Sequence, residues 1–172
     1  AAVKQNGHAL EFVENQTEKI CLAAVKQNEL SIKYVVNQTE AICLEAVRKQ
    51  GYMLEFVREQ TEEICIEAVK QNFSALMNVK HPSDKIYLEA VKANPTAIRI
   101  IANQTEELCI EAVERDPYQL GNIRNQSIDI CFLATKINPN VIYYIKDYNI
   151  RKIIEEQLKY NNTKSARNVL VC

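Results

Sequence analysis

Five cysteines stand at multiples of 22 residues from one another, and such a pattern could hold a metal or form disulfides. Equivalent positions in packed neighbouring helices lie about 8–10 Å apart. A disulfide needs Cα atoms within roughly 7 Å, and a zinc site brings thiolate sulfurs to about 4 Å from one another. The chain contains no CxxC pair, and its two histidines, His8 and His81, stand alone. The sequence therefore predicts no metal and no cofactor. It predicts buried apolar thiols at Cys21, Cys43, Cys65, Cys109 and Cys131.

Basic residues form a second repeating set, which could follow a phosphate backbone. Glutamates stand three residues before several of them on the same helical face, as Glu67 does before Lys70. Other glutamates stand in the first turn of four of the long helices, at Glu18, Glu40, Glu62 and Glu106. An acidic N-terminus and a basic C-terminus are favoured by the helix dipole. This arrangement favours a solvated, ion-paired face over a nucleic-acid site. The basic row consists of Lys4, Lys26, Arg48, Lys70, Lys92 and Lys136.

Catalytic chemistry has no candidate residues in this sequence. The chain has no glycine-rich phosphate loop, no nucleophile elbow, and no Ser or Cys beside a His. An active site needs one unique constellation, whereas this chain offers the same residues many times, so we predict that it is not an enzyme. Helix capping explains the glycosylation-like sequons better than glycosylation does. These begin at Asn15, Asn37, Asn103 and Asn125.

The cysteines, basic residues and sequons recur because the chain contains an internal repeat of 22 residues. Long segments of the NQTEKICLAAVKQN type start at Asn15, Asn37, Glu59, His81, Asn103 and Asn125. Each predicts a helix of about eleven residues with one buried stripe, followed by a shorter helix. Two helices of this length cannot bury a core alone, so neighbouring copies must stack. The predicted fold class is all-α, an α-solenoid of about seven helix-turn-helix repeats.

The buried stripe of the first long helix is predicted to be Ile20, Cys21, Ala24 and Val25. The buried face of the first short helix is predicted to be Ala9, Leu10, Phe12 and Val13. Asn or Asp precedes most short helices as an N-cap, and Asn138 with Pro139 at the next position is one such pair. The long helix is capped either by Thr17 or by Asn15, the latter with Glu18 closing a capping box.

The domain organisation is inferred from the part of the chain in which the 22-residue pattern is present. Residues 1–148 are predicted to form the array, with a first copy truncated at its N-terminus, so we expect a fragment of a longer array. Residues 149–172 are predicted to form an atypical C-terminal cap. Within it, NIRKIIEEQLKY reads as a helix, whereas NNTKSARNVLVC is expected to be irregular.

The strings QTEEICIEAVKQN and GYMLEFVR resemble a family of short repeats of unknown function that is abundant in mimivirus-type giant viruses of amoebae. The resemblance covers the chain up to about Asp147. It implies an α-solenoid in a protein made inside a host cell, and it implies no catalytic residues. Two copies depart from the family pattern, with Tyr87 in place of Cys and Thr135 in place of Val, and we expect the packing around these residues to differ from that of the other copies.

Composition and charge narrow the classes of partner. A formal net charge of −1 supplies no global attraction for nucleic acid or an acidic membrane. No apolar run approaches the roughly 18 residues of a membrane span, and no signal-peptide pattern opens the chain. We therefore expect no membrane association and a cytoplasmic protein. If it is viral, we expect it in the host cell cytoplasm, with the virion as the alternative.

Variable exposed positions on the short helices are the candidate binding surface, because packing and capping do not constrain them. Several carry apolar or amphipathic groups of the kind found in interfaces. The candidates are Leu30, Tyr52, Met77, Arg99, Tyr118 and Tyr143. The leading hypothesis is a scaffold that binds a protein or peptide. The alternative functions are single-stranded nucleic-acid binding along the basic row and structural self-association. Random sequence drift on a solvent-exposed face would also explain the variability, without any binding function.

Overall fold

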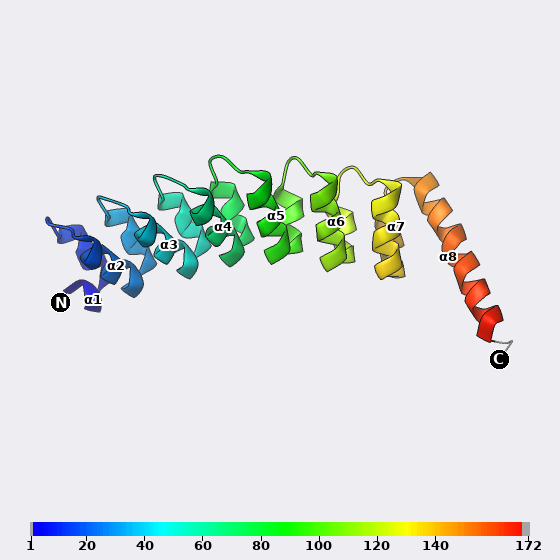
Figure 1. Ribbon diagram of the computed structural model, residues 1–172, viewed down its shortest axis with the longest axis horizontal. Helices are drawn as coiled ribbons and strands as arrows, with labels where there is room; N and C mark the ends of the chain where they lie inside the picture. The colour runs from blue at the N-terminus through cyan, green and yellow to red at the C-terminus, as the bar shows by residue number, and fades with distance from the viewer. Residues whose placement is uncertain (1, 170–172) are drawn as a thin grey trace. The chain divides into compact units, whose positions relative to one another are not determined.

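The computed structural model describes residues 2–169, with side chains through residue 161. α-Helices alternate with 3-10 helices, labelled η, and no strand occurs in this described range (Figure 1). The elements are α1 (Ala2–Gln5), η1 (Gly7–Phe12), α2 (Glu18–Gln27), η2 (Glu29–Tyr34), α3 (Glu40–Lys49), η3 (Gly51–Phe56), α4 (Glu62–Gln71), η4 (Phe73–Asn78), α5 (Asp84–Ala93), η5 (Pro95–Ile100), α6 (Glu106–Arg115), η6 (Pro117–Asn122), α7 (Ile128–Ile137), η7 (Pro139–Tyr144) and α8 (Tyr148–Val169). The prediction of an all-α repeat solenoid is confirmed.

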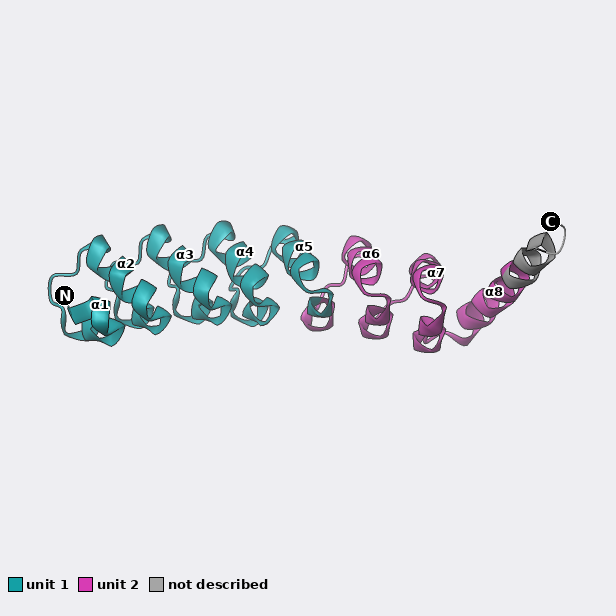
Figure 2. Cartoon of the chain, turned by 90° about the horizontal axis from the view of Figure 1, so that it is seen from below, with its two compact units in different colours: residues 1–97 teal, residues 98–172 magenta. Residues whose placement is uncertain are grey.

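The chain divides into two compact units, residues 1–97 (unit 1) and residues 98–172 (unit 2), coloured separately in Figure 2. In unit 1, α2 to α5 pack each on the next, and so do η1 to η4. In unit 2, α6 packs on α7 and η6 on η7, while α8 lies against α7 and η7. Long and short helices therefore form two layers within each unit. The predicted boundary between array and cap, after residue 148, falls inside unit 2 and stays a prediction.

The long helices bury the predicted stripe. In α2, Cys21, Ala24 and Val25 are buried and Ile20 is half-buried. Later copies bury all four equivalent positions, except that Tyr87 in α5 is half-buried. The alanine of each stripe, as in Ala24 and Ala46, has no exposed surface. A small side chain at this position lets neighbouring helices approach closely, which explains why alanine recurs there.

The helix ends settle the capping alternatives. The Thr17 hydroxyl accepts from the Ile20 N–H, and α2 starts at Glu18, so Thr17 is the N-cap rather than Asn15. The caps of the short helices are as predicted. The Asn138 side chain accepts from the Asn140 N–H, and Pro139 occupies the first helical position. These short side-chain bonds satisfy backbone donors that the first turn leaves free.

The short helices are 3-10 helices, and this corrects one predicted face. A 3-10 helix has three residues per turn, so side chains three apart share an edge. Leu10 is fully buried, but Phe12 is 83% exposed and does not share the buried face predicted for it. The buried edge instead follows the spacing of three, for example Ile32 with Val35.

The C-terminal cap is one long helix. As predicted, NIRKIIEEQLKY is helical, and Asp147 caps it by accepting from the Asn149 and Ile150 N–H groups. The prediction of an irregular segment after Tyr160 was wrong, because α8 continues to Val169. No Pro or Gly occurs in NNTKSARNV to interrupt it. Residues 170–172, the last part of that prediction, lie outside the described residues.

Candidate interaction surface

The two variable positions of each short helix lie on one edge. They are three residues apart, for example Tyr52 and Glu55, and a 3-10 helix aligns such side chains one above the other. Repeating this edge along stacked short helices produces one continuous ridge within each unit. We call it the short-helix ridge. It consists of residues 8, 11, 30, 33, 52, 55, 74, 77 and 96 in unit 1, and 99, 118, 121, 140 and 143 in unit 2.

The predicted binding residues are distributed over both units. Leu30, Tyr52 and Met77 belong to unit 1, and Arg99, Tyr118 and Tyr143 belong to unit 2. Among the apolar and aromatic candidates, Met77 and Tyr143 are the most exposed, at 78% and 79%, whereas Leu30 is half-buried. The structure thus brings the candidates onto two separately described ridges.

Aromatic side chains at the last position of a short helix reach the ridge of the preceding repeat. The Tyr34 ring lies edge-on to His8, with centroids 6.0 Å apart, and Lys33 Nζ lies 4.1 Å from the centre of the Phe56 ring. Tyr144 lies edge-on to Tyr118, also at 6.0 Å. Sequence reasoning did not include Tyr144 among the candidates, although it completes the aromatic group of unit 2.

A ladder of glutamines joins successive repeats and was not anticipated from the sequence. Gln38 Nε2 donates to the Ile32 carbonyl at 3.3 Å and to the Phe56 carbonyl at 2.9 Å. Its Oε1 accepts from the Arg58 N–H at 3.0 Å. One side chain therefore ties the ends of two consecutive short helices. Equivalent bonds are made by Gln16, Gln60, Gln104 and Gln126.

The cysteine column is linked to this ladder. The Cys21 thiol donates to Gln16 Oε1 over 3.6 Å, and Cys43 and Cys65 lie similarly against their own glutamines. In the repeat that begins at His81, glutamine and cysteine are replaced together, by Pro82 and Tyr87. Their joint replacement is the sequence signal from which the ladder could have been inferred.

Burial of these thiols raises their pKa. Desolvation is the largest cause at Cys21, Cys43, Cys65 and Cys109, and it raises the pKa of Cys131 to about 11. A high pKa keeps the thiols neutral, whereas metal binding and nucleophilic attack need thiolates. No cluster of three or more His, Cys, Asp or Glu suited to a metal ion is found among the described residues.

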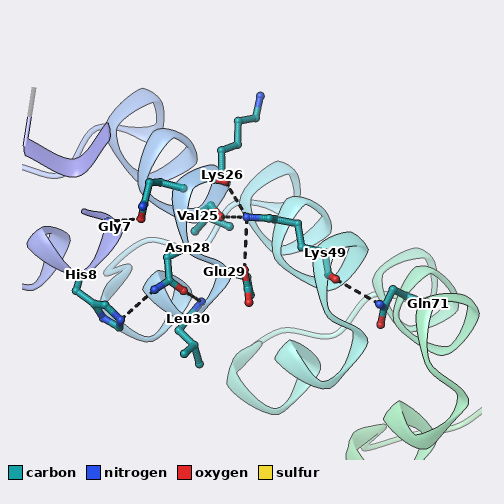
Figure 3. A network of polar contacts seen from close by, with 10 residues as sticks. Gly7, His8, Val25, Lys26, Asn28, Glu29, Leu30, Lys49 and Gln71 are labelled. Atoms are coloured by element: carbon teal, nitrogen blue, oxygen red, sulfur yellow. Dashed lines mark hydrogen bonds and ion pairs between the residues drawn. The ribbon is translucent and has the colours of Figure 1, made fainter. Parts of the chain in front are cut away.

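The corners between long and short helices have matched residue pairs (Figure 3). The Gly7 N–H donates to Gln27 Oε1 at 2.6 Å, and a Cβ on Gly7 would stand 2.5 Å from the Ser31 hydroxyl. Lys49 replaces glutamine in the next repeat, where it pairs with Glu29 at 3.4 Å and donates to the Lys26 carbonyl. Glycine at the start of a short helix is therefore matched by glutamine at the corner of the next repeat, and glutamate by lysine.

Basic residues directly after the short helices also serve the fold. Arg58 donates to the carbonyls of Val35 and Val36, and Lys80 donates to that of Arg58. Arg124 and Lys146 make equivalent bonds in unit 2. These cations satisfy carbonyls at the end of the preceding short helix, and they are distinct from the basic row identified in the sequence.

Three members of the basic row in unit 1, Arg48, Lys70 and Lys92, are ion-paired, and no ion pair of Lys4 or Lys26 is found among the described residues. Arg48 contacts Glu67 at 2.8 Å and Lys70 contacts Glu89 at 3.0 Å, both across neighbouring repeats. Only Lys92 makes the pair expected within one helix, with Glu89 at 3.5 Å. Side-by-side helices bring these charges together across the 19 residues that separate them in sequence. A hydrogen bond from Lys70 lowers the pKa of the Glu89 carboxyl.

One apolar groove lies between α7 and α8, with a volume of about 270 Å³. Phe132 and Leu133 line one side, and Ile154 and Leu158 line the other. Ile154 stands seven residues after its N-cap, where the other long helices carry the small alanine. A bulkier side chain at this close-packing position spaces α8 from α7, which accounts for the groove.

In the described part of the chain, no helix combines the length and apolar character needed to cross a bilayer. A comparison with protein-family models finds no match for this chain, and comparisons with curated proteins and with solved structures find none either.

Proposed function

We propose that this chain is a non-catalytic repeat scaffold that binds a protein or peptide along the short-helix ridge. The observation that carries the proposal is the 3-10 geometry of the short helices, which aligns the two variable positions of every repeat. Exposed aromatic or apolar residues such as Tyr52, Met77 and Tyr143 stand on that edge. Stacked repeats present such edges as an extended surface on which several weak contacts can add.

The ion pairing of the long helices supports a protein partner over a nucleic acid. A single strand needs a row of cations facing its phosphates. Arg48, Lys70 and Lys92 are instead engaged by Glu67 and Glu89. The alternating charge of this face disfavours a polyanion, so we place the binding activity on the short-helix layer.

We further propose that the protein acts in the cytoplasm of a host cell. This part of the proposal rests on the resemblance of strings such as QTEEICIEAVKQN to repeats of giant viruses of amoebae. Recovery of partners from amoebal lysate, with identification by mass spectrometry, addresses both the partner and its compartment.

The test replaces the ridge tyrosines. Tyr52, Tyr118 and Tyr143 changed together to Ser should abolish capture of the partner, because aromatic anchors commonly contribute 2 kcal/mol or more to an interface. Helicity should be unchanged. A small fall in melting temperature is expected, because Tyr118 loses an edge-to-face contact with Tyr144 of about 0.5–1.5 kcal/mol.

The matched control changes Lys26, Lys70 and Lys92 together to Gln on the long-helix face. It should leave capture of a protein unchanged. If the lysine variant loses its partner and the tyrosine variant keeps it, the ridge is the wrong surface. A partner that is a nucleic acid would then show weaker binding and a flatter dependence on salt in the lysine variant.

A further inference from the structure

The short helices of unit 2 carry no carboxylate. Arg99 is the one charged side chain in residues 98–100, 117–122 and 139–144. The short helices of unit 1 differ, since they contain Glu11, Glu29, Glu55 and Lys33. The two ridges therefore share their geometry but not their charge.

Tyrosines dominate the ridge of unit 2. Tyr143 is 79% exposed, and Tyr118 and Tyr144 are about half exposed. Gly121 stands between them in the ridge pattern, and a Cβ there would lie 2.9 Å from the Tyr144 ring. Glycine thus allows the Tyr118 and Tyr144 rings to pack edge-to-face, which fixes both in place. We call Arg99, Tyr118, Tyr143 and Tyr144 the tyrosine ridge.

The carboxylates nearest to the tyrosine ridge in sequence are already hydrogen-bonded. Asp116 accepts from the Tyr118 N–H at 3.0 Å and from Gln119 Nε2 at 2.7 Å. Asp147 accepts from two N–H groups at the start of α8. Arg124 and Lys146 donate to backbone carbonyls, and this bonding leaves their positive charge in place. Asp116 and Asp147 keep their negative charge in the same way, so the charges beside the ridge balance. The ridge itself holds one cation, Arg99, and no carboxylate, and this makes it complementary to a negative ligand.

We propose that the tyrosine ridge binds an acidic, extended segment of a partner polypeptide. The inference rests on the proposed function and assigns it a location and a ligand chemistry. Tyrosine hydroxyls can donate to carboxylates while their rings cover apolar side chains of the same segment. Arg99 can take a carboxylate through two parallel hydrogen bonds.

A polypeptide fits this surface better than a single-stranded nucleic acid. Tyr118 and Tyr144 pack against each other, so a base cannot enter between their rings. A nucleic acid also carries one phosphate per nucleotide, whereas the tyrosine ridge has a single cation, Arg99. A peptide with spaced carboxylates needs fewer cations than a phosphate backbone does.

The experiment selects peptides from a random display library on the full chain. Recovered peptides should be enriched about twofold or more in Asp and Glu over the unselected library. A synthetic copy of one such peptide should lose about tenfold or more in affinity when Tyr143 is changed to Ser or Arg99 to Glu. Affinity should also fall as salt is raised.

The matched control is Tyr148→Ser, which removes an exposed tyrosine at the start of α8, outside the tyrosine ridge, and should keep the affinity of the acidic peptide. Recovery of neutral or basic peptides, or loss of binding in this control, would overturn the inference while leaving a ridge that binds peptides. Tighter binding of a fluorescein-labelled oligothymidylate than of any selected peptide would also overturn it. Because the proposed function is tested by capture from lysate, the two failures can be told apart.

Discussion

Units 1 and 2 use the same ladder but differ in what else joins their repeats. Both have glutamines that tie consecutive short helices, with Gln38 in unit 1 and Gln126 in unit 2 making the same set of bonds. Unit 1 adds ion pairs between neighbouring repeats, such as Arg48 with Glu67. In the described part of unit 2, the ion pair found is between Arg115 and Glu111, within α6.

The outer face of the last repeat shows the difference most clearly. Leu133 stands where the four preceding repeats have glutamate, as at Glu89, and Phe132 precedes it. Glu114 occupies the basic-row position in α6, so a glutamate at residue 133 would have had no cation there to pair with. The hydrogen bonds from glutamine side chains to the backbone are therefore common to both units, whereas the charged residues on the surface vary between repeats.

The largest effect is expected from breaking the shared ladder. Gln60→Ala and Gln126→Ala each remove a side chain bonded to two carbonyls and one N–H. Leaving such groups unpaired should lower the free energy of unfolding by about 2–4 kcal/mol in either unit. Urea unfolding followed by circular dichroism measures this loss. The controls are Glu59→Ala and Asn125→Ala, which change the exposed residues directly before these glutamines and should hardly alter the free energy of unfolding. If Gln→Ala destabilises only one unit, the glutamine ladder does not have the same role in both.

The cysteine column should respond to added volume in both units. Cys65→Leu should cost on the order of 1–3 kcal/mol through overpacking, and Cys131→Leu should cost a similar amount, because both thiols are buried. Thermal unfolding measures the loss. Rapid reaction of these thiols with a water-soluble reagent in the native protein would contradict their burial, as would bound zinc detected by metal analysis.

Alkaline pH should weaken both units through the same cysteines. Burial raises the pKa of Cys131 to about 11 from a usual 9.0, so the neutral thiol is favoured in the folded state. This contribution is fully present below pH 9.0 and is lost as the pH rises toward about 11. Cys131→Ala should flatten the dependence of stability on pH in that range. An equally steep dependence in the variant would mean that other groups cause it.

Caps should show a smaller effect of opposite sign in the two units. Asn138→Ala removes a side-chain bond in unit 2 and should cost about 1 kcal/mol. Gln50 in unit 1 makes no capping bond, so Gln50→Asn should stabilise by a few tenths of a kcal/mol up to about 1. Melting temperatures of the two variants check both signs. A neutral Asn138→Ala would mean that the bond to the Asn140 N–H contributes nothing.

The smallest effect concerns the ion pairs, which should distinguish the units. Hydrogen bonds from Lys85 and Ser83 lower the pKa of Glu62, and one from Lys70 lowers that of Glu89. Their contribution is present above pH about 4.5 and is lost as the pH falls below it. Amide exchange should therefore quicken in α4 and α5 at low pH or high salt before it does in α6. Equal changes in both units would show that these exposed pairs do not set local stability.

The sequence alone determined the features that depend on local spacing. A period of 22 residues, a buried stripe in each long helix and Asn or Asp before the short helices were enough to predict stacked helical pairs. The cap at Asn138 and the buried position of Cys65 followed from the same patterns. These features involve residues within one or two turns of each other, where helical geometry fixes which side chains meet.

Tertiary structure decided the contacts that cross repeats. Gln38 bonds to carbonyls 6 and 18 residues away, and its role follows only once two short helices are stacked. Arg48 reaches Glu67 in the next repeat for the same reason. Phe12 is exposed because stacking leaves the short segment as a 3-10 helix, whose edge differs from that of an α-helix. Amphipathic periodicity records which side of a helix is buried, but the distance between neighbouring helices decides which polar groups can bond across them.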